Sequence, residues 1–259
     1  MVYELTWQER EKTGTERCRR ETGRLRSSRR LARITGGITE PLSEARGKYR
    51  AQLLKVAEKI TRGLNEGLTS RKRPRRKSTK TKTAFQLKIT LEEVQPAVWR
   101  VFQVLDCTLL DLHETIQVVM GWENRHLYEF QFGDVRYCDP SACDGSDVVD
   151  AGRIKLSHVV SQGYERFAYL YDFGDHWQHV AEIESTFQPE DGVTFPVCLE
   201  GSGNCPPEDV AGTMEYARFL KVINEPDDGE YQRYLDWCGG WFDPDAFDLE
   251  LVNRLLGQA

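Results

Sequence analysis

The sequence lacks any long apolar run. Hydrophobic residues make up 39% of its 259 residues, and no stretch reaches the roughly 18–20 consecutive apolar residues that a membrane-spanning helix needs. The first ten residues are charged and lack the apolar segment of a secretory signal peptide. These two absences predict a cytoplasmic protein that does not engage a membrane.

The chain also lacks the short motifs that identify several common enzyme classes. Neither glycine-rich phosphate-binding pattern, GxGxxG or GxxxxGK[S/T], occurs, and the metalloprotease motif HExxH and the hydrolase motif GxSxG are absent too. The seven cysteines are an odd number and contain no CxxC pair. We therefore expect reduced thiols, and neither a zinc ribbon nor a disulfide framework.

Charge is divided unevenly along the chain. Residues 1–83 contain 24 Lys and Arg against 9 Asp and Glu, a net charge of +15. Residues 84–259 contain 11 Lys and Arg against 32 Asp and Glu, a net charge of −21. Such asymmetry predicts that the basic extension contacts a polyanion or the acidic remainder of its own chain.

Within the extension, only residues 40–66 show an apolar pattern. Residues 1–38 are rich in Arg, Glu, Thr and Gly, a composition that cannot form a core, so we expect disorder or fragments of helix there. Steps of three and four residues predict one amphipathic basic helix at about 40–66, whose stripe must pack on the body or on a second copy. The stripe consists of Leu42, Ala45, Tyr49, Leu53, Val56, Ile60 and Leu64.

A dense basic run links this helix to the rest of the chain. Its proline and its like charges are typical of a solvated linker, which is the simpler interpretation. Nucleic-acid binding is the alternative, because clustered Lys and Arg attract phosphates. The residues that would bind nucleic acid are Arg71, Lys72, Arg73, Arg75, Arg76 and Lys77.

The body, residues 84–259, shows strand patterns first and helical patterns mainly later. Because no regular strand–helix–strand alternation occurs, we predict an α+β fold, a mostly antiparallel sheet with packed helices. Strands are predicted at 85–91, 98–104, 127–132, 135–137, 167–173 and 179–184. Helices are predicted from Thr108 to Gly121, at 154–160 as a helix or turn, at 213–223, at 228–237, and from an Asp243 N-cap with Pro244 as first residue. Predicted core residues are Trp99, Leu112, Ile116, Phe130, Tyr171, Phe247, Leu251 and Leu255.

The most distinctive polar segment is Tyr169–His179, YLYDFGDHWQH. A tight turn would bring Asp172 and His179 together across a hairpin, where they could bind a divalent metal or act as a general base and its orienting group. The simpler interpretation is that Asp172 and Asp175 satisfy turn amides and His179 bonds locally. Trp177 is expected in the core, with an edge available for stacking on a ring.

A second polar segment is Gly203–Asp209, GNCPPED. It offers Cys205 as a ligand or nucleophile beside Glu208 and Asp209. Nearby carboxylates raise the pKa of a thiol, which argues against an activated nucleophile. A capped helix start with a buried thiol is the simpler interpretation.

Two stiff, polar segments in one domain are most simply explained by a shared location. We therefore hypothesise that Asp172, His179 and the loop 205–209 converge on one concave surface, with His113 near it. The alternative has each segment capping its own turn, far from the other.

Several motifs follow one another along the body, at 95–100, 108–113, 116–117, 121–122, 126–130, 171–179, 205–209 and 237–244. In this order they resemble the plasmid pRiA4b ORF-3-like family across roughly residues 84–257. The resemblance implies an α+β fold and similarity to a passenger protein of a mycobacterial insertion sequence that was labelled a resolvase. Where the family usually has a second histidine after His126, this chain has Tyr128. Further departures are Ala211-Gly212, where a double glycine is usual, Glu215-Tyr216, where Gly-Tyr is usual, and 227–231, where a histidine is usual.

Two functional hypotheses follow. The first is an interaction or nucleic-acid-associated module of mobile-element origin, in which the basic extension contacts phosphates. The second is metal-assisted hydrolysis or transfer at a site built from Asp172, Asp175, His179, Cys205, Glu208 and Asp209. Recombinase chemistry is disfavoured because a resolvase needs several arginines together to hold a phosphate, and the arginines of the body are scattered along the sequence.

Overall fold

The computed structural model describes residues 82–141, 143 and 148–257. The predictions for the irregular segments, for the helix at 40–66 and for the basic run at 71–77 lie outside these residues. Within the part of the chain that the structure describes, no helix is long and apolar enough to cross a membrane.

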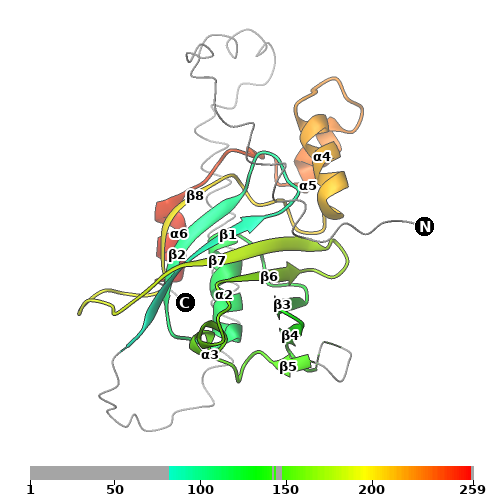
Figure 1. Ribbon diagram of the computed structural model, residues 1–259. Coiled ribbons are helices and arrows are strands. Elements are labelled where there is room, and N and C mark those ends of the chain that lie inside the picture. The colour runs from blue at the N-terminus through cyan, green and yellow to red at the C-terminus, as the bar shows by residue number, and fades with distance from the viewer. Residues whose placement is uncertain (1–81, 142, 144–147, 258–259) are drawn as a thin grey trace, which may run out of the picture. The chain divides into compact units, whose positions relative to one another are not determined.

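The described residues form an eight-stranded sheet with helices packed against it (Figure 1). The strand order is β5-β4-β3-β6-β7-β1-β2-β8, and every neighbouring pair is antiparallel except β4 and β5. The predicted α+β fold with a mostly antiparallel sheet is confirmed. The strands are β1 Ala84–Leu91, β2 Trp99–Leu105, β3 Tyr128–Phe132, β4 Val135–Cys138, β5 Val148–Asp150, β6 Arg166–Tyr171, β7 Trp177–Phe187 and β8 Val197–Ser202.

Strand β1 lies near the centre of the sheet, between β2 and β7. Phe85, Leu87, Ile89 and Leu91 are buried, as their alternation with polar residues predicts. Trp99 was expected in the core and is only partly buried. It lies opposite Thr90 in the register, so it shares the face of β1 that carries Thr90 and Lys88, and the Lys88 ammonium lies 5.2 Å from its ring centroid.

The helices in the described residues are α2 Leu109–Met120, α3 Leu156–Ser161, α4 Gly212–Ile223, α5 Tyr231–Trp237 and α6 Leu249–Leu256. The start and end of α2 follow the prediction closely. Thr108 and Asp111 form a reciprocal capping box, and Gly121 ends the helix with a φ of 101°. The apolar face of α2 is fully buried and packs against β2 and α6.

The last helix begins later than predicted. Asp248 is its N-cap and accepts a hydrogen bond from the Leu251 N–H, whereas Asp243 accepts one from Asp245 in the preceding turn. Both aspartates satisfy a local amide, and the sequence pattern did not distinguish a turn from a helix start. Leu251 is buried, while Phe247 and Leu255 are partly buried.

Strand β8 was not predicted. The sequence indicated helical structure after Phe195, but Val197–Ser202 pairs with β2 at the edge of the sheet. The Asn253 side chain holds this strand on α6, because its amide donates to the Cys198 carbonyl and accepts from the Cys198 N–H, both at 2.8 Å. Long-range bonds of this kind leave no periodic signal in the sequence.

One cysteine pair departs from the expectation of reduced thiols. Cys138 and Cys143 form a disulfide, with Cα atoms 6.6 Å apart. A turn brings them together, since the Cys143 N–H donates to the Asp139 carbonyl. Among the described residues, the free cysteines are Cys107, Cys198, Cys205 and Cys238.

We predict that a chain beginning at residue 82 folds on its own. Every strand that pairs in the sheet and every buried core residue described comes after that position, so the core stays complete. Urea unfolding followed by far-ultraviolet and near-ultraviolet circular dichroism should give coincident, cooperative transitions. A fragment without fixed tertiary packing would show that the boundary is wrong.

Candidate metal centre

Three segments far apart in the sequence meet beside one edge of the core. They are the loop after α2 (residues 121–127), the end of β6, and the loop after β8 (residues 203–211). They bring His126, Asp172 and Glu208 together, with one ligand-type atom of each residue within 4.8 Å of the others. His126 Nε2 lies 3.6 Å from Asp172 Oδ2 and 3.6 Å from Glu208 Oε2.

The Glu208 carboxylate is anchored through one oxygen only. Its Oε1 accepts hydrogen bonds from the Glu123 N–H and from the Tyr171 hydroxyl, both at 2.8 Å. Its Oε2 is buried and has no hydrogen-bond partner. The side chain is only 5% exposed, so water does not compensate the second oxygen, which faces His126.

Asp172 is arranged in the same way. Its Oδ1 accepts a hydrogen bond of 2.8 Å from the Gly174 N–H, while Oδ2 is directed at His126. Its backbone is held on both sides, because its N–H donates to the Leu127 carbonyl and its carbonyl accepts from the His176 N–H. Each carboxylate therefore has one oxygen fixed by the protein and one aimed at a common point.

The third ligand candidate, His126, contributes a second buried atom without a hydrogen-bond partner. Its Nε2 lies 3.0 Å from Oδ1 of Asp209, yet this contact lacks hydrogen-bond geometry. Asp209 is 54% exposed and also lies 3.3 Å from an Arg125 nitrogen. It is therefore an exposed carboxylate at the rim of the cluster, whereas Glu208 and Asp172 are buried.

The spacing of these atoms suits a first-row divalent metal. Ligands at about 2.0–2.1 Å from a tetrahedral zinc ion lie about 3.3–3.4 Å from one another. The two 3.6 Å separations from His126 Nε2 are close to that value. Imidazole and carboxylate donors together favour zinc, iron or manganese over calcium, which prefers oxygen ligands alone.

Backbone strain is concentrated in the same three segments. Asn124, Asp172 and Asp209 have φ values of 53°, 57° and 61°, the left-handed region that few residues other than glycine adopt. Each lies within two residues of a ligand candidate or is one itself. Strained conformations of this kind persist where the surroundings impose them and are frequent at functional sites.

Tyr171 joins the three segments. Its hydroxyl accepts a hydrogen bond from the Arg125 N–H at 3.0 Å and donates to Glu208. Burial, reinforced by the charge of Glu208, raises the pKa of this tyrosine, so it remains a hydrogen-bond donor. Tyr171 thus orients Glu208 as outer-shell partners orient metal ligands.

His113 supports the site from inside the core. Its Nε2 lies 2.9 Å from the Asn124 side-chain oxygen and its Nδ1 lies 2.8 Å from the Tyr169 hydroxyl. The Gln117 side chain accepts from the Asn124 N–H and donates to the same hydroxyl. Burial lowers the pKa of His113 to about 4, so the imidazole is neutral at pH 7. These bonds fix the loop that carries His126.

His179 does not join Asp172, contrary to the pairing expected from the sequence. Its ring is fully buried, where Nε2 accepts from the Trp122 indole N–H at 3.3 Å and Nδ1 bonds the Tyr169 carbonyl at 3.2 Å. Burial lowers the pKa of His179 to about 4. Alternation along β7 places this residue on the core face, so it packs the interior beneath the site.

The other predicted residues have supporting positions. Asp175 accepts from the Ala211 N–H at 2.9 Å, which ties the loop 203–211 to the β6–β7 turn. Trp177 is completely buried, with its ring centroid 5.5 Å from that of Trp122. Cys205 is buried, and burial raises the pKa of its thiol well above the usual value, so it is not an activated nucleophile.

His126 is the residue that the sequence hypothesis omitted from the site. It precedes β3 in a loop, at no helical or strand spacing from another ligand candidate. One signal was present, because the run His126–Phe130 carries part of the family resemblance. The other two ligands come from segments 46 and 82 residues farther along the chain, so no local pattern contains the set.

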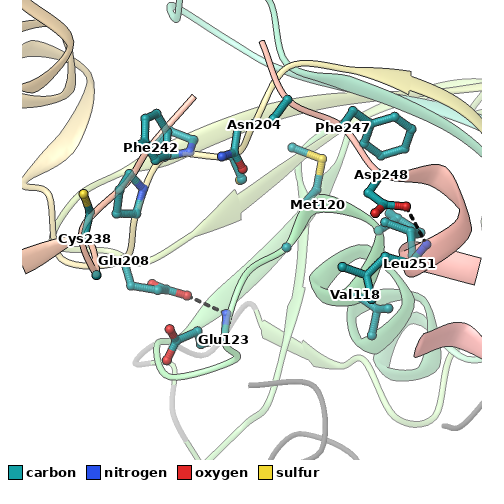
Figure 2. A pocket seen from close by; sticks show the side chains of 18 of the residues that line it. Val118, Met120, Glu123, Asn204, Glu208, Cys238, Phe242, Phe247, Asp248 and Leu251 are labelled. Atoms are coloured by element: carbon teal, nitrogen blue, oxygen red, sulfur yellow. Dashed lines mark hydrogen bonds between the residues drawn. The ribbon is translucent and has the colours of Figure 1, made fainter. Parts of the chain in front are cut away.

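A groove of about 1000 Å³ includes Glu208 and the neighbouring Asp209 in its lining. Figure 2 shows the Glu208 carboxylate at one end of the groove, where it accepts a hydrogen bond from the Glu123 N–H. Phe247 and Leu251 lie towards the other end. The groove is walled by the end of α2, the loop 203–211 and the segment from α5 to α6. Of the three ligand candidates, Glu208 lines the groove, whereas His126 and Asp172 do not.

Comparisons with known proteins place the site within a shared domain. A family model described as plasmid pRiA4b ORF-3-like protein matches residues 83–251, which include all three ligand candidates. The uncharacterized protein y4hQ of Sinorhizobium fredii (strain NBRC 101917 / NGR234) is 41% identical over 177 residues, 67% of this chain and 91% of that protein. The crystal structure of MM3350, a protein of unknown function from Methanosarcina mazei Go1, aligns with a TM-score of 0.61 and 32% identity, covering 66% of this chain and 98% of that one.

We predict that Glu208→Gln stabilises the metal-free protein. Burial raises the pKa of Glu208 above its value in the unfolded chain, so the charged form lowers stability as the pH rises above the unfolded pKa. The neutral amide keeps the oxygen that accepts from Glu123 and Tyr171. At pH 7 the free energy of unfolding should rise by about 0.5–2 kcal/mol, the usual gain when a functional compromise is removed.

The matched control is Glu225→Gln, an exposed glutamate outside the cluster. The gain at Glu208 should shrink as the pH falls below about 4.5, where both states of the wild-type chain are protonated. Chemical unfolding at a series of pH values measures both effects. A variant that is less stable than the wild type at pH 7 would contradict the assignment of Oε2 as an uncompensated acceptor.

Proposed function

This chain belongs to the plasmid pRiA4b ORF-3-like family, and we propose that its shared domain binds a divalent transition metal and uses it in hydrolytic or group-transfer chemistry. The ligands are His126, Asp172 and Glu208. The observation that carries the proposal is the pair of buried atoms without hydrogen-bond partners, His126 Nε2 and Glu208 Oε2, which face each other at 3.6 Å.

Hydrogen bonds within the protein leave both atoms of this pair unsatisfied, and His126 Nε2 has only ion-pair contacts, with Asp172, Glu208 and Asp209. Buried polar atoms without partners destabilise a fold by about 1–3 kcal/mol each. A cation between them would satisfy both atoms. The hydrogen bonds to Glu208 Oε1 and Asp172 Oδ1 would keep the two carboxylates oriented towards it. Strain at Asn124, Asp172 and Asp209 in the same place supports a selected function rather than chance.

Three protein ligands leave coordination positions open to water and substrate, as in catalytic rather than structural zinc sites. A bound metal lowers the pKa of its water and polarises a carbonyl or phosphoryl group. A metal held by His126, Asp172 and Glu208 would supply an acidified water as nucleophile. Asp209, the exposed carboxylate whose Oδ1 lies 3.0 Å from His126 Nε2, would be placed to accept a proton from that water and to return it to a leaving group.

Tyr128 stands where the family usually has a second histidine, but this difference removes none of the three ligand candidates, His126, Asp172 and Glu208. The Tyr128 ring stacks on His113, with ring centroids 3.6 Å apart and planes 10° apart, within the core. The side chain at this position therefore belongs to the supporting layer. The ligands in this chain are one imidazole and two carboxylates.

We predict that the full chain binds Zn²⁺ or Mn²⁺ at one saturable site in isothermal titration calorimetry. His126→Ala and Asp172→Asn should each weaken binding by more than the roughly 10–100-fold that loss of an outer-shell partner costs. Metal should also raise the midpoint of thermal unfolding, because it binds the folded state.

Two histidine variants serve as controls. His158→Ala removes an exposed histidine on α3 and should change neither affinity nor stability. His179→Ala should lower stability by roughly 2–5 kcal/mol, as truncation of a large buried side chain does, without weakening metal binding by the folded protein. Equal metal affinity in wild type and His126→Ala would refute the proposed centre.

The division of charge supports a second proposal, nucleic-acid binding by the basic extension. The net charge of +15 in residues 1–83 attracts phosphates, whereas the −21 of residues 84–259 repels them. Any contact with nucleic acid would therefore use the extension, and the densest basic run within it is 71–77. This proposal agrees with a mobile-element origin and is independent of the metal centre.

We predict that duplex DNA binding by the full chain weakens steeply with salt. In a plot of the logarithm of the binding constant against the logarithm of the salt concentration, each lost phosphate contact should reduce the steepness of the slope by about 0.9. Substituting the six basic residues of 71–77 by glutamine should lower both affinity and slope. Glutamine at six arginines of equal charge, Arg17, Arg19, Arg20, Arg24, Arg26 and Arg29, should have a smaller effect. No retention of DNA at low salt would remove the proposal.

A further inference from the structure

The groove beside the candidate metal centre is suited to a specific kind of occupant. Its walls are largely apolar and aromatic, and the last helix opens onto it with exposed apolar groups. Trp237 is 44% exposed and Leu249 is 36% exposed, values high for large apolar side chains that line a hollow. A partner that covers these groups must present apolar side chains of its own.

The charged groups of the groove are mostly acidic. The carboxylates that line it are Glu123, Glu208, Asp209, Asp236, Asp248 and Glu250. Against them stand two guanidinium groups. Arg100 is buried and donates to backbone carbonyls, including those of Val119 and Gly203, and Arg125 lies beside Glu123 and Asp209. An occupant that combines an apolar stripe with basic flanks fits this surface best.

We propose that residues 40–66 of the same chain dock in this groove. The segment carries the apolar stripe that begins at Leu42 and ends at Leu64. Six basic residues and only two acidic ones lie between these ends, a net charge of +4. Its charge and its apolar periodicity therefore both complement the groove. The stripe contacts the apolar walls, and Lys55 and Lys59 approach the carboxylates at the rim.

The length of the linker permits docking within one chain. Residues 67–83 separate the segment from β1, and 17 residues span at most about 56–61 Å. The chain enters the sheet at Ala84, and β1 is eight residues long, about 26 Å. Its far end lies by β2, where Arg100 bonds the last carbonyls of α2 at the groove. The linker therefore exceeds the distance along the strand about twofold.

Docking within the chain also gains from proximity. A tethered segment has an effective concentration in the millimolar range for a flexible linker, so weak contacts suffice to fill the groove. This inference does not depend on metal binding, because it rests on the walls and the rim of the groove.

The test is zero-length carbodiimide crosslinking of the full chain, which joins lysines to carboxylates in direct contact. An equal mixture of unlabelled and ¹⁵N-labelled protein is used, and the crosslinked peptides are identified by mass spectrometry. We expect Lys55 or Lys59 joined to Asp236 or Glu250, with both peptides carrying the same label. Contacts between two copies would instead give mixed labels in about half of the pairs.

Two variants locate the contact. Leu53→Asp with Ile60→Asp places charges in the stripe and should abolish the crosslinks, while Leu25→Asp with Leu31→Asp, outside the stripe, should leave them. On the groove side, Leu249→Asn should abolish them too, because it removes an apolar contact without adding a carboxylate. Its control is Met214→Asn, because Met214 is 82% exposed and does not line the groove. Both positions are exposed, so neither substitution disturbs the core.

The remaining outcomes overturn the proposal. Mixed-label crosslinks would show that a second copy fills the groove and that the segment mediates self-association. Crosslinks that involve only lysines of the linker would show a contact by charge without the stripe. Crosslinks that survive Leu249→Asn, or no crosslink to a groove carboxylate at all, would show that the segment lies elsewhere.

Discussion

The buried carboxylate of Glu208 is the constraint on which the site depends. One oxygen is held by the Tyr171 hydroxyl and the Glu123 N–H, which come from two different segments. The other oxygen faces His126 without a hydrogen bond. Burial of a charge is unfavourable unless it is compensated, and burial raises the pKa of this carboxyl accordingly. The fold supplies half of the compensation, and a cation would supply the rest.

Several layers of the protein keep that carboxylate in place. The capping box of α2 and the glycine after it set where the loop 121–127 begins. His113 and Gln117 on α2 then hold Asn124 in its left-handed conformation, which directs His126 towards Asp172. From the opposite side, Asp175 ties the loop that carries Glu208 to the β6–β7 turn. Each layer acts through backbone position, so the ligands are held by the scaffold rather than by one another.

The sequence predicted what is encoded locally. The start and end of α2 and the alternation in β1 depend on neighbours within a few residues, and both are confirmed. The meeting of Asp172 with the loop 205–209 was also expected, since two stiff polar segments suggested one location. Local patterns did not reveal β8, which depends on pairing with β2, or the role of His126, whose partners lie far along the chain. His179 lies two residues after Trp177 on the same face of β7, so the expected burial of Trp177 already placed this histidine in the core rather than beside Asp172.

The two proposals for the body are coupled through the same charges. Glu208 belongs both to the candidate metal cluster and to the lining of the groove, and Asp209, at the rim of the cluster, lines the groove too. A divalent cation there adds two positive charges near a surface whose negative charge attracts residues 40–66. Metal and segment should therefore weaken each other's binding, and thermodynamic linkage makes the effect equal in both directions. On the two proposals, the acidic body would take two cationic occupants, one an ion and one a part of its own chain, and they would compete for the same negative charge. The division of charge in the sequence would be the origin of that competition.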